Sequence, residues 1–138
     1  MTVTASKPSR QGTPLVVFFH GNSFPASTYR VMLDALRQRG MRVEALEKIG
    51  HDPAYPVTSN WPHLVKEVHA FAQPLRDAHA GPLVLVGHSL GGMLSLMLAA
   101  QAPALADAVV MVDAPAVGGL QAKVLQLSKT LALNKKFS

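Results

Sequence analysis

The 138-residue chain contains no cysteine, which excludes disulfides, thiolate metal centres and a cysteine nucleophile. Charged residues are also few, at 15% against 49% hydrophobic residues. This apolar fraction excludes a largely disordered chain, and the length suits one domain with a sizeable core. The polar segment from Met1 to Thr13 lacks the apolar stretch of a signal peptide. The sequence therefore predicts a globular protein, which we expect to be cytoplasmic.

Long uninterrupted hydrophobic runs are absent as well. The longest one, residues 83–100, contains Gly87, His88 and Ser89 near its centre, whereas a membrane span needs about 20 apolar residues. The histidines fall at no spacing that is typical of a metal site. We therefore expect no membrane span, no metal and no cofactor.

The basic charge of the chain is confined to its two ends. Six of the 13 lysines and arginines lie in the first ten and last sixteen residues, leaving seven bases against all eight acids between them. Nucleic-acid-binding proteins usually carry a clustered basic stripe, which this distribution does not provide. We expect no nucleic-acid partner.

Strand-like and helix-like segments alternate along the chain. Apolar runs typical of buried strands occupy residues 15–19, 83–86 and 108–112, and a shorter strand is expected near residues 42–46. Helical spacing of apolar residues separates them, with the third helix expected at about residues 90–100. Connections of this length predict an α/β fold, in which a parallel sheet has helices on both faces.

The ends of the first two helices are predicted from capping residues. Ser27 or Thr28 is expected to cap the first helix, and Gly40 to end it. The pair at residues 59–60, Ser-Asn, is expected to cap the second helix. Pro74 should kink or end that helix, because it lacks an amide proton and crowds the preceding turn.

The sharpest motif is Gly87-His88-Ser89-Leu90-Gly91, with Gly92 behind it. It lies between a predicted strand and a predicted helix, where a serine is held in a strained conformation that lifts its hydroxyl above the sheet. The start of the helix also offers unpaired amides that stabilise negative charge. The motif predicts Ser89 as a nucleophile and the Leu90 amide as an oxyanion-hole donor. The alternative is a glycine-rich turn in which Ser89 only caps the helix.

A second motif, His20-Gly21-Asn22-Ser23, closes the first predicted strand. The oxyanion of ester hydrolysis is best held by two preorganised donors. We favour the backbone amide of Asn22 as the second donor, with Ser23 next, while His20 and Gly21 support the loop. His20 is expected to anchor this loop by hydrogen bonding rather than to act as a base. The alternative is an Asn-Ser turn that only closes the strand.

Together with a strand that ends in Val112-Asp113-Ala114-Pro115, these motifs resemble the α/β-hydrolase family. The resemblance covers roughly residues 15–115 and implies a partial α/β-hydrolase fold. It also implies a serine hydrolase similar to esterases, lipases or thioesterases, acting on a small-molecule ester. The segment Asn22 to Arg30 looks like the oxyanion loop of haloalkane dehalogenases, but those enzymes use an aspartate where this chain has Ser89.

The resemblance implies the chain order serine, acid, histidine, yet no histidine follows His88. Asp113, at the end of the fourth strand, is a candidate catalytic acid; otherwise it caps the next turn. His51 is a conceivable surrogate base, in a loop after the second strand. Phe24, Tyr29 and Trp61 are candidates for a pocket, and core packing explains them equally well.

We expect the chain to be the N-terminal portion of a longer hydrolase, truncated before the catalytic histidine; a compact variant completed by a partner chain is the alternative. We divide it into a flexible N-terminus (1–13), an α/β-hydrolase core (14–119) and an amphipathic segment (120–138) that could begin a lid. The strand at 108–112 would then form an exposed edge, open to self-association. A non-catalytic scaffold that binds a partner through this edge is the second functional hypothesis.

Overall fold

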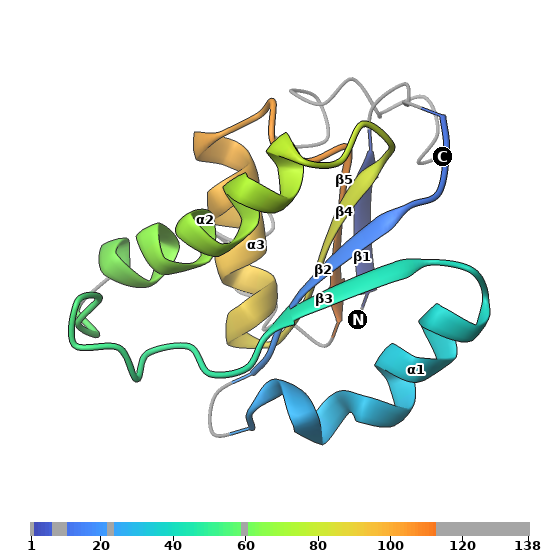
Figure 1. Cartoon of the computed structure of the whole chain (residues 1–138). Helices are drawn as coiled ribbons and strands as arrows, with labels where there is room; N and C mark the ends of the chain where they lie inside the picture. The colour runs from blue at the N-terminus through green and yellow to red at the C-terminus, as the bar shows by residue number, and fades with distance from the viewer. Residues whose placement is uncertain (1, 7–10, 22–23, 59–60, 113–138) are drawn as a thin grey trace.

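The computed structural model describes residues 2–6, 11–21, 24–58 and 61–112 (Figure 1). The predicted C-terminal segment, residues 120–138, lies outside them. The described strands form one sheet in the order β1-β5-β4-β2-β3. Strands β2 to β5 are parallel, and β1 is antiparallel to β5. The bounds are β1 (Thr2–Ser6), β2 (Leu15–Phe19), β3 (Arg42–Leu46), β4 (Leu83–His88) and β5 (Ala108–Val112).

Helices cover both faces of the sheet (Figure 1). Helix α1 (Arg30–Gln38) follows a short 3₁₀ turn, η1 (Ala26–Tyr29), and lies on one face. Helices α2 (Pro62–Asp77) and α3 (Leu90–Gln101) lie on the other. The prediction of a parallel sheet with helices on both faces is confirmed, with β1 as an antiparallel addition. Within the described ranges, no helix is both long and apolar enough to cross a bilayer.

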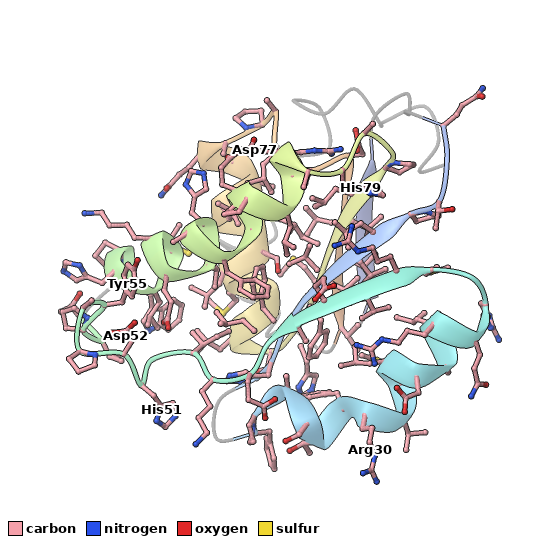
Figure 2. The ribbon with its side chains drawn as sticks, in the orientation of Figure 1. Arg30, His51, Asp52, Tyr55, Asp77 and His79 are labelled. Carbon is pink, nitrogen blue, oxygen red and sulfur yellow. The ribbon has the colours of Figure 1, made fainter. Side chains whose placement is uncertain are left out.

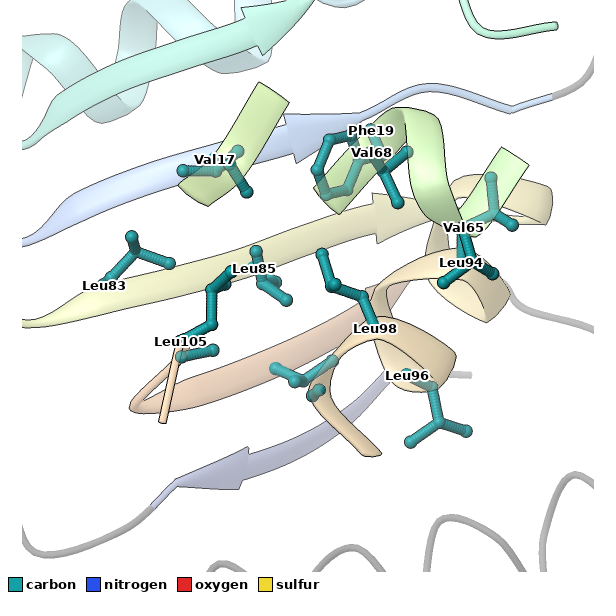
Figure 3. Packing of buried hydrophobic residues seen from close by; sticks show 14 of the residues in the cluster. Val17, Phe19, Val65, Val68, Leu83, Leu85, Leu94, Leu96, Leu98 and Leu105 are labelled. Carbon is teal, nitrogen blue, oxygen red and sulfur yellow. The ribbon is translucent and has the colours of Figure 1, made fainter. Parts of the chain in front are cut away.

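Strand β2 is apolar at every position because both of its faces are covered. Val16 and Phe18 pack with Leu33 of α1, whereas Val17 and Phe19 pack on the side of α2 and α3. Figure 3 shows this second, larger cluster between the sheet and the two helices. A strand buried on both faces reads as a continuous hydrophobic run, which is why its bounds were predictable.

The N-terminal segment differs from the prediction. Residues 1–13 were expected to be flexible and β5 to be an exposed edge, but Thr2–Ser6 pairs with β5, from Thr2 opposite Val112 to Ser6 opposite Ala108. The pairing occupies the outer hydrogen-bonding side of β5, so β1 and β3 are the edges of the described sheet. A partner cannot dock on β5 while β1 is there, which removes the surface that the scaffold hypothesis required.

The start of α1 also differs from the prediction. Ser27 and Thr28 do not cap it, because they lie inside η1. Helix α1 begins at Arg30 without a side-chain cap. Its end agrees better with the prediction, since Gly40 follows the last turn with φ +88°, a conformation that glycine adopts at little cost.

Helix α2 continues past Pro74 to Asp77, so of the two predicted effects of this proline, a kink or the end of the helix, the structure excludes the end. Pro74 is exposed and stands in the last turn, where its missing N–H removes one backbone hydrogen bond of the helix. The residue at the N-cap position is Trp61, in a left-handed conformation with φ 54°. The predicted capping pair at residues 59–60 lies outside the described residues.

A buried ion pair joins α2 to the starts of β4 and β5. Arg76 and Asp107 are 3.1 Å apart and nearly inaccessible to solvent. Asp107 also accepts a hydrogen bond of 2.9 Å from the Leu83 amide. The Arg76 guanidinium donates to the backbone carbonyls of Leu105, His79 and Gly81. These bonds tie α2 to the end of the sheet that lies opposite to the turn at Ser89.

Candidate active site

Ser89 lies between the end of β4 and the first residue of α3. Its backbone has φ 53° and ψ −117°, a region that costs a non-glycine residue about 1–3 kcal/mol. The Ser89 amide donates to the Val112 carbonyl at 3.1 Å, and the Ser89 carbonyl accepts from the Met93 amide at 3.1 Å. Strand β5 and the first turn of α3 therefore hold the strained serine from two sides.

Two glycines allow this turn to form. A Cβ at Gly87 would lie 2.2 Å from the carbonyl oxygen of Gly91, and a Cβ at Gly91 would lie 1.9 Å from the carbonyl oxygen of Phe19. Both distances are far below van der Waals contact. Because these glycines have no side chains, the backbone of the turn packs directly against itself and against the end of β2. This packing places the loop that begins at His20 (the His20 loop) beside Ser89.

His20 is 5% exposed and uses both ring nitrogens on backbone groups. The Ile49 amide donates to its Nε2 at 2.8 Å. Its Nδ1 therefore carries the hydrogen, which it donates to the Gly21 carbonyl at 2.7 Å. Neither nitrogen is left for proton transfer with Ser89.

Tyr29 links the His20 loop to the Ser89 turn. Its hydroxyl accepts a hydrogen bond of 3.0 Å from the Gly21 amide and shares a second one of 2.8 Å with Nδ1 of His88. The tyrosine ring is tilted against the rings of Phe18 and His88, with centroids 4.7 Å and 5.5 Å away. Sequence reasoning named Tyr29 only as a pocket or core candidate, because its contacts depend on tertiary placement.

Ser89 faces a cleft of about 380 Å³. Its walls come from the loop after β3, the beginning of α2 and the beginning of α3. Most of the lining side chains are apolar, and Trp61 is among them, whereas Phe24 and Tyr29 are not. The cleft is lined by Ile49, Gly50, His51, Val57, Trp61, Leu64, Ser89, Leu90 and Met93.

Two buried side chains hold the loop that forms one wall of this cleft. His20 accepts the Ile49 amide, as described above, and Oε1 of Glu67 accepts the Gly50 amide at 3.0 Å. Glu67 is 7% exposed and projects from α2. Successive amides of the loop are thus fixed from the sheet and from a helix.

His51 lines the same cleft as Ser89, but its side chain is exposed and points away from the body of the molecule (Figure 2). His69 and His79 bond elsewhere, to Gln73 and to the Thr13 carbonyl. Across the part of the chain that the structure describes, no histidine is hydrogen-bonded to Ser89. The described residues likewise include no group of three or more acidic or histidine side chains that could hold a metal ion.

Asn22, Ser23 and Asp113 lie outside the described residues, so their predicted roles stay predictions. Gly21, which precedes Asn22, and Val112, which precedes Asp113, are described, and both contact the Ser89 turn. A Cβ at Gly21 would lie 3.2 Å from the His88 carbonyl oxygen, and the Val112 carbonyl accepts the Ser89 amide.

Comparison with known proteins agrees with this geometry. An esterase from Mycobacterium tuberculosis is 36% identical over 101 residues, covering 72% of this chain and 33% of the relative. A putative non-heme haloperoxidase of Mycobacterium phage D29 is 33% identical over 106 residues, covering 76% and 37%. A crystal structure from work on carboxylesterases of Nitrososphaera gargenis matches with a TM-score of 0.55 and 27% identity, over 78% of this chain and 39% of that one.

The chain spans about a third of the length of these curated relatives. Residues 16–134 match the sequence model of the alpha/beta hydrolase family, which includes the whole of the described site. With the strand order of the sheet and the geometry of the Ser89 turn, this match shows that the chain belongs to the α/β-hydrolase family.

Proposed function

We propose that this chain carries the nucleophile and the oxyanion hole of a serine hydrolase that cleaves carboxylic ester or thioester bonds. The observation that carries the proposal is the backbone of Ser89. A strained, positive-φ serine between a strand and a helix is retained only where surrounding structure over-determines it, and such strain is typical of a nucleophile turn. Esterases and lipases among the relatives support the same reaction class.

In this reaction Ser89 Oγ bonds to the substrate carbonyl carbon, and the amides of Leu90 and Asn22 hold the resulting oxyanion. Leu90 is the first residue of α3, where helix amides have no partner within the helix. Loss of one oxyanion donor costs about 3 kcal/mol in other enzymes. Collapse of the intermediate breaks the bond to the alcohol or thiol, and water then releases the acyl group from Ser89.

The proposed reaction also needs a base that takes the proton of Ser89, and none of the described histidines is placed to do so. His20 is engaged by backbone groups, His88 faces Tyr29, and His51 points outward. We therefore propose that the histidine base comes from polypeptide outside these 138 residues, and that Asp113 is a candidate for the acid. Because loss of triad members costs several orders of magnitude in rate, the 138-residue chain alone should hydrolyse esters slowly.

The cleft supports a small-molecule substrate. A volume of about 380 Å³ lies at the small end of the range for ligand pockets, about 300–1,000 Å³. Its apolar walls would bury an acyl chain more readily than a charged group. We accordingly expect short, uncharged acyl groups to react best.

The test uses a fluorophosphonate probe, with imidazole added to replace the missing base. Ser89 Oγ bonds to phosphorus, fluoride leaves, and imidazole accepts the hydroxyl proton. Mass spectrometry of the intact chain should show one added group, formed faster as imidazole is increased. Ser89→Ala should abolish the labelling, and Ser27→Ala, which alters an exposed serine, should leave it unchanged. Labelling that persists in Ser89→Ala would refute the assignment of the nucleophile.

A further inference from the structure

The hydroxyl of Tyr29 bridges two segments that are far apart in the sequence. It is bonded to the Gly21 amide at 3.0 Å and to Nδ1 of His88 at 2.8 Å. Gly21 directly precedes Asn22, and His88 directly precedes Ser89. One oxygen atom therefore connects the loop that contains one proposed oxyanion donor with the turn that contains the nucleophile.

The groups involved fix the direction of one of the two hydrogen bonds. A backbone N–H can only donate, so the Tyr29 oxygen accepts from Gly21. For the second bond we assign the hydroxyl hydrogen to Nδ1 of His88, which places the ring hydrogen of His88 on Nε2, and the tautomer of His88 tests this assignment. In this arrangement the three groups are mutually satisfied.

Gly21 is what makes so close an approach feasible. A Cβ at this position would lie 2.9 Å from Nδ1 of His88 and 3.2 Å from the Tyr29 hydroxyl. A side chain there would push one of the two partners away. The glycine, the tyrosine and the histidine thus form one contact, although they come from three separate segments.

The ring of Tyr29 is held independently of its hydroxyl. It packs on Phe18, which is fully buried in β2, with centroids 4.7 Å apart and an interplanar angle of 56°. Removing only the hydroxyl should therefore leave the ring in place. A Tyr29→Phe variant therefore separates the effect of the two hydrogen bonds on the site from the effect of ring packing.

We propose that Tyr29 is a positioning residue for the reaction, an inference that rests on the proposed function. Its hydroxyl fixes Gly21 relative to the Ser89 turn, and these two segments lead directly into the two proposed donors, the amides of Asn22 and Leu90. Both amides must reach one oxygen at hydrogen-bond distance. A misplacement of about 1 Å can cost on the order of 100-fold in rate. Tyr29 itself touches none of the reacting atoms.

The test compares Tyr29→Phe with Tyr55→Phe in the 138-residue chain. Tyr55 is the only other tyrosine and lies in the loop between β3 and α2 (Figure 2). The rate of Ser89 phosphonylation, with imidazole present, is measured against fluorophosphonate concentration. Tyr29→Phe should lower the maximal rate about tenfold or more, with little change in the half-saturating concentration, because the cleft is untouched. Tyr55→Phe should match the unmodified chain.

A second readout requires no reaction. With ¹⁵N-labelled histidine, the His88 ring in the unmodified chain should give the NMR signature of a single Nε2–H tautomer. Tyr29→Phe should give a mixture of both tautomers, and Tyr55→Phe should not. His88→Phe removes the same bond from the other side and carries the test if Tyr29→Phe does not fold. The double variant should show no loss beyond that of Tyr29→Phe, because Tyr29→Phe already breaks the bond to His88.

The outcomes separate the two proposals. If Ser89 is labelled in the unmodified chain and Tyr29→Phe reacts at the same maximal rate, the positioning role is wrong and the proposed function stands. The positioning role is also overturned if Tyr29→Phe raises the half-saturating concentration and leaves the maximal rate unchanged, because that result would mean a role in binding. If Ser89 is not labelled in the unmodified chain, the proposed function fails, and the positioning role fails with it.

Discussion

The carbonyl oxygen of Phe19 lies 1.9 Å from the point that a Cβ of Gly91 would occupy. The end of β2 therefore contacts the first turn of α3 backbone to backbone. This contact brings the His20 loop next to Ser89, so the spacing of the candidate site depends on the absence of one side chain.

Gly91→Ala should accordingly destabilise the fold by at least about 3 kcal/mol, because neither backbone can yield as a flexible side chain would. Urea unfolding followed by the fluorescence of Trp61, the only tryptophan, measures this loss.

Gly40→Ala is the control. Gly40 has φ +88°, but no atom of the described residues lies within 4 Å of the point that its Cβ would occupy. That variant should therefore lose only about 1–2 kcal/mol through backbone strain. Equal losses would contradict the tight contact at Gly91.

Ser89→Gly should be more stable than Ser89→Ala. Alanine keeps the positive-φ strain of about 1–3 kcal/mol, whereas glycine relieves it and loses about 1 kcal/mol or less through chain entropy. The net difference should be about 1 kcal/mol in favour of glycine, measured by urea unfolding, and both variants should lose probe labelling.

Ser27 provides the matched comparison for that prediction. It lies in η1 without a positive φ, so Ser27→Gly should be less stable than Ser27→Ala. The order of stability is therefore expected to reverse between the two serines. The same order at both positions would show that Ser89 is not strained.

Glu67→Ala should loosen the wall of the cleft, because the Gly50 amide loses the carboxylate oxygen that it contacts at 3.0 Å. An unpaired buried donor costs about 1–3 kcal/mol. Gly50 is only partly buried, so we expect a loss of about 1 kcal/mol and faster hydrogen exchange at Gly50. Glu67→Gln keeps an acceptor oxygen and should change both quantities little. Glu44→Ala, at a half-exposed side chain in β3, is the control. Unchanged exchange at Gly50 in Glu67→Ala would show that this bond does not hold the loop.

The strands were predictable wherever burial on two faces left a continuous apolar run. The predicted bounds of β2 and β5 agree with the structure, and β4 extends two residues further, to His88. The bounds of β3 agree as well, although β3 contains Arg42 and Glu44 and only Val43 in it is buried. The Ser89 turn was predictable because glycines flank a serine between two such elements. In each case the physical cause is local and therefore visible in the sequence.

The features that sequence reasoning missed depend on contacts between distant segments. Strand β1 is short and mostly polar, and it is a strand because it pairs with β5 about a hundred positions later. The bridge from Gly21 through Tyr29 to His88 likewise joins three segments whose spacing follows no periodic pattern. Pro74 does not end its helix, which continues for three residues beyond it, and the proline is exposed in the last turn.

The pairing of β1 has a practical consequence for anyone who purifies this protein. Thr2 is opposite Val112 in the sheet, and the carbonyl of Val112 binds the amide of Ser89. An affinity tag fused at the amino end is thus attached only a few contacts away from the proposed nucleophile. Tagged and untagged preparations should be compared before a low labelling rate is ascribed to the chain itself.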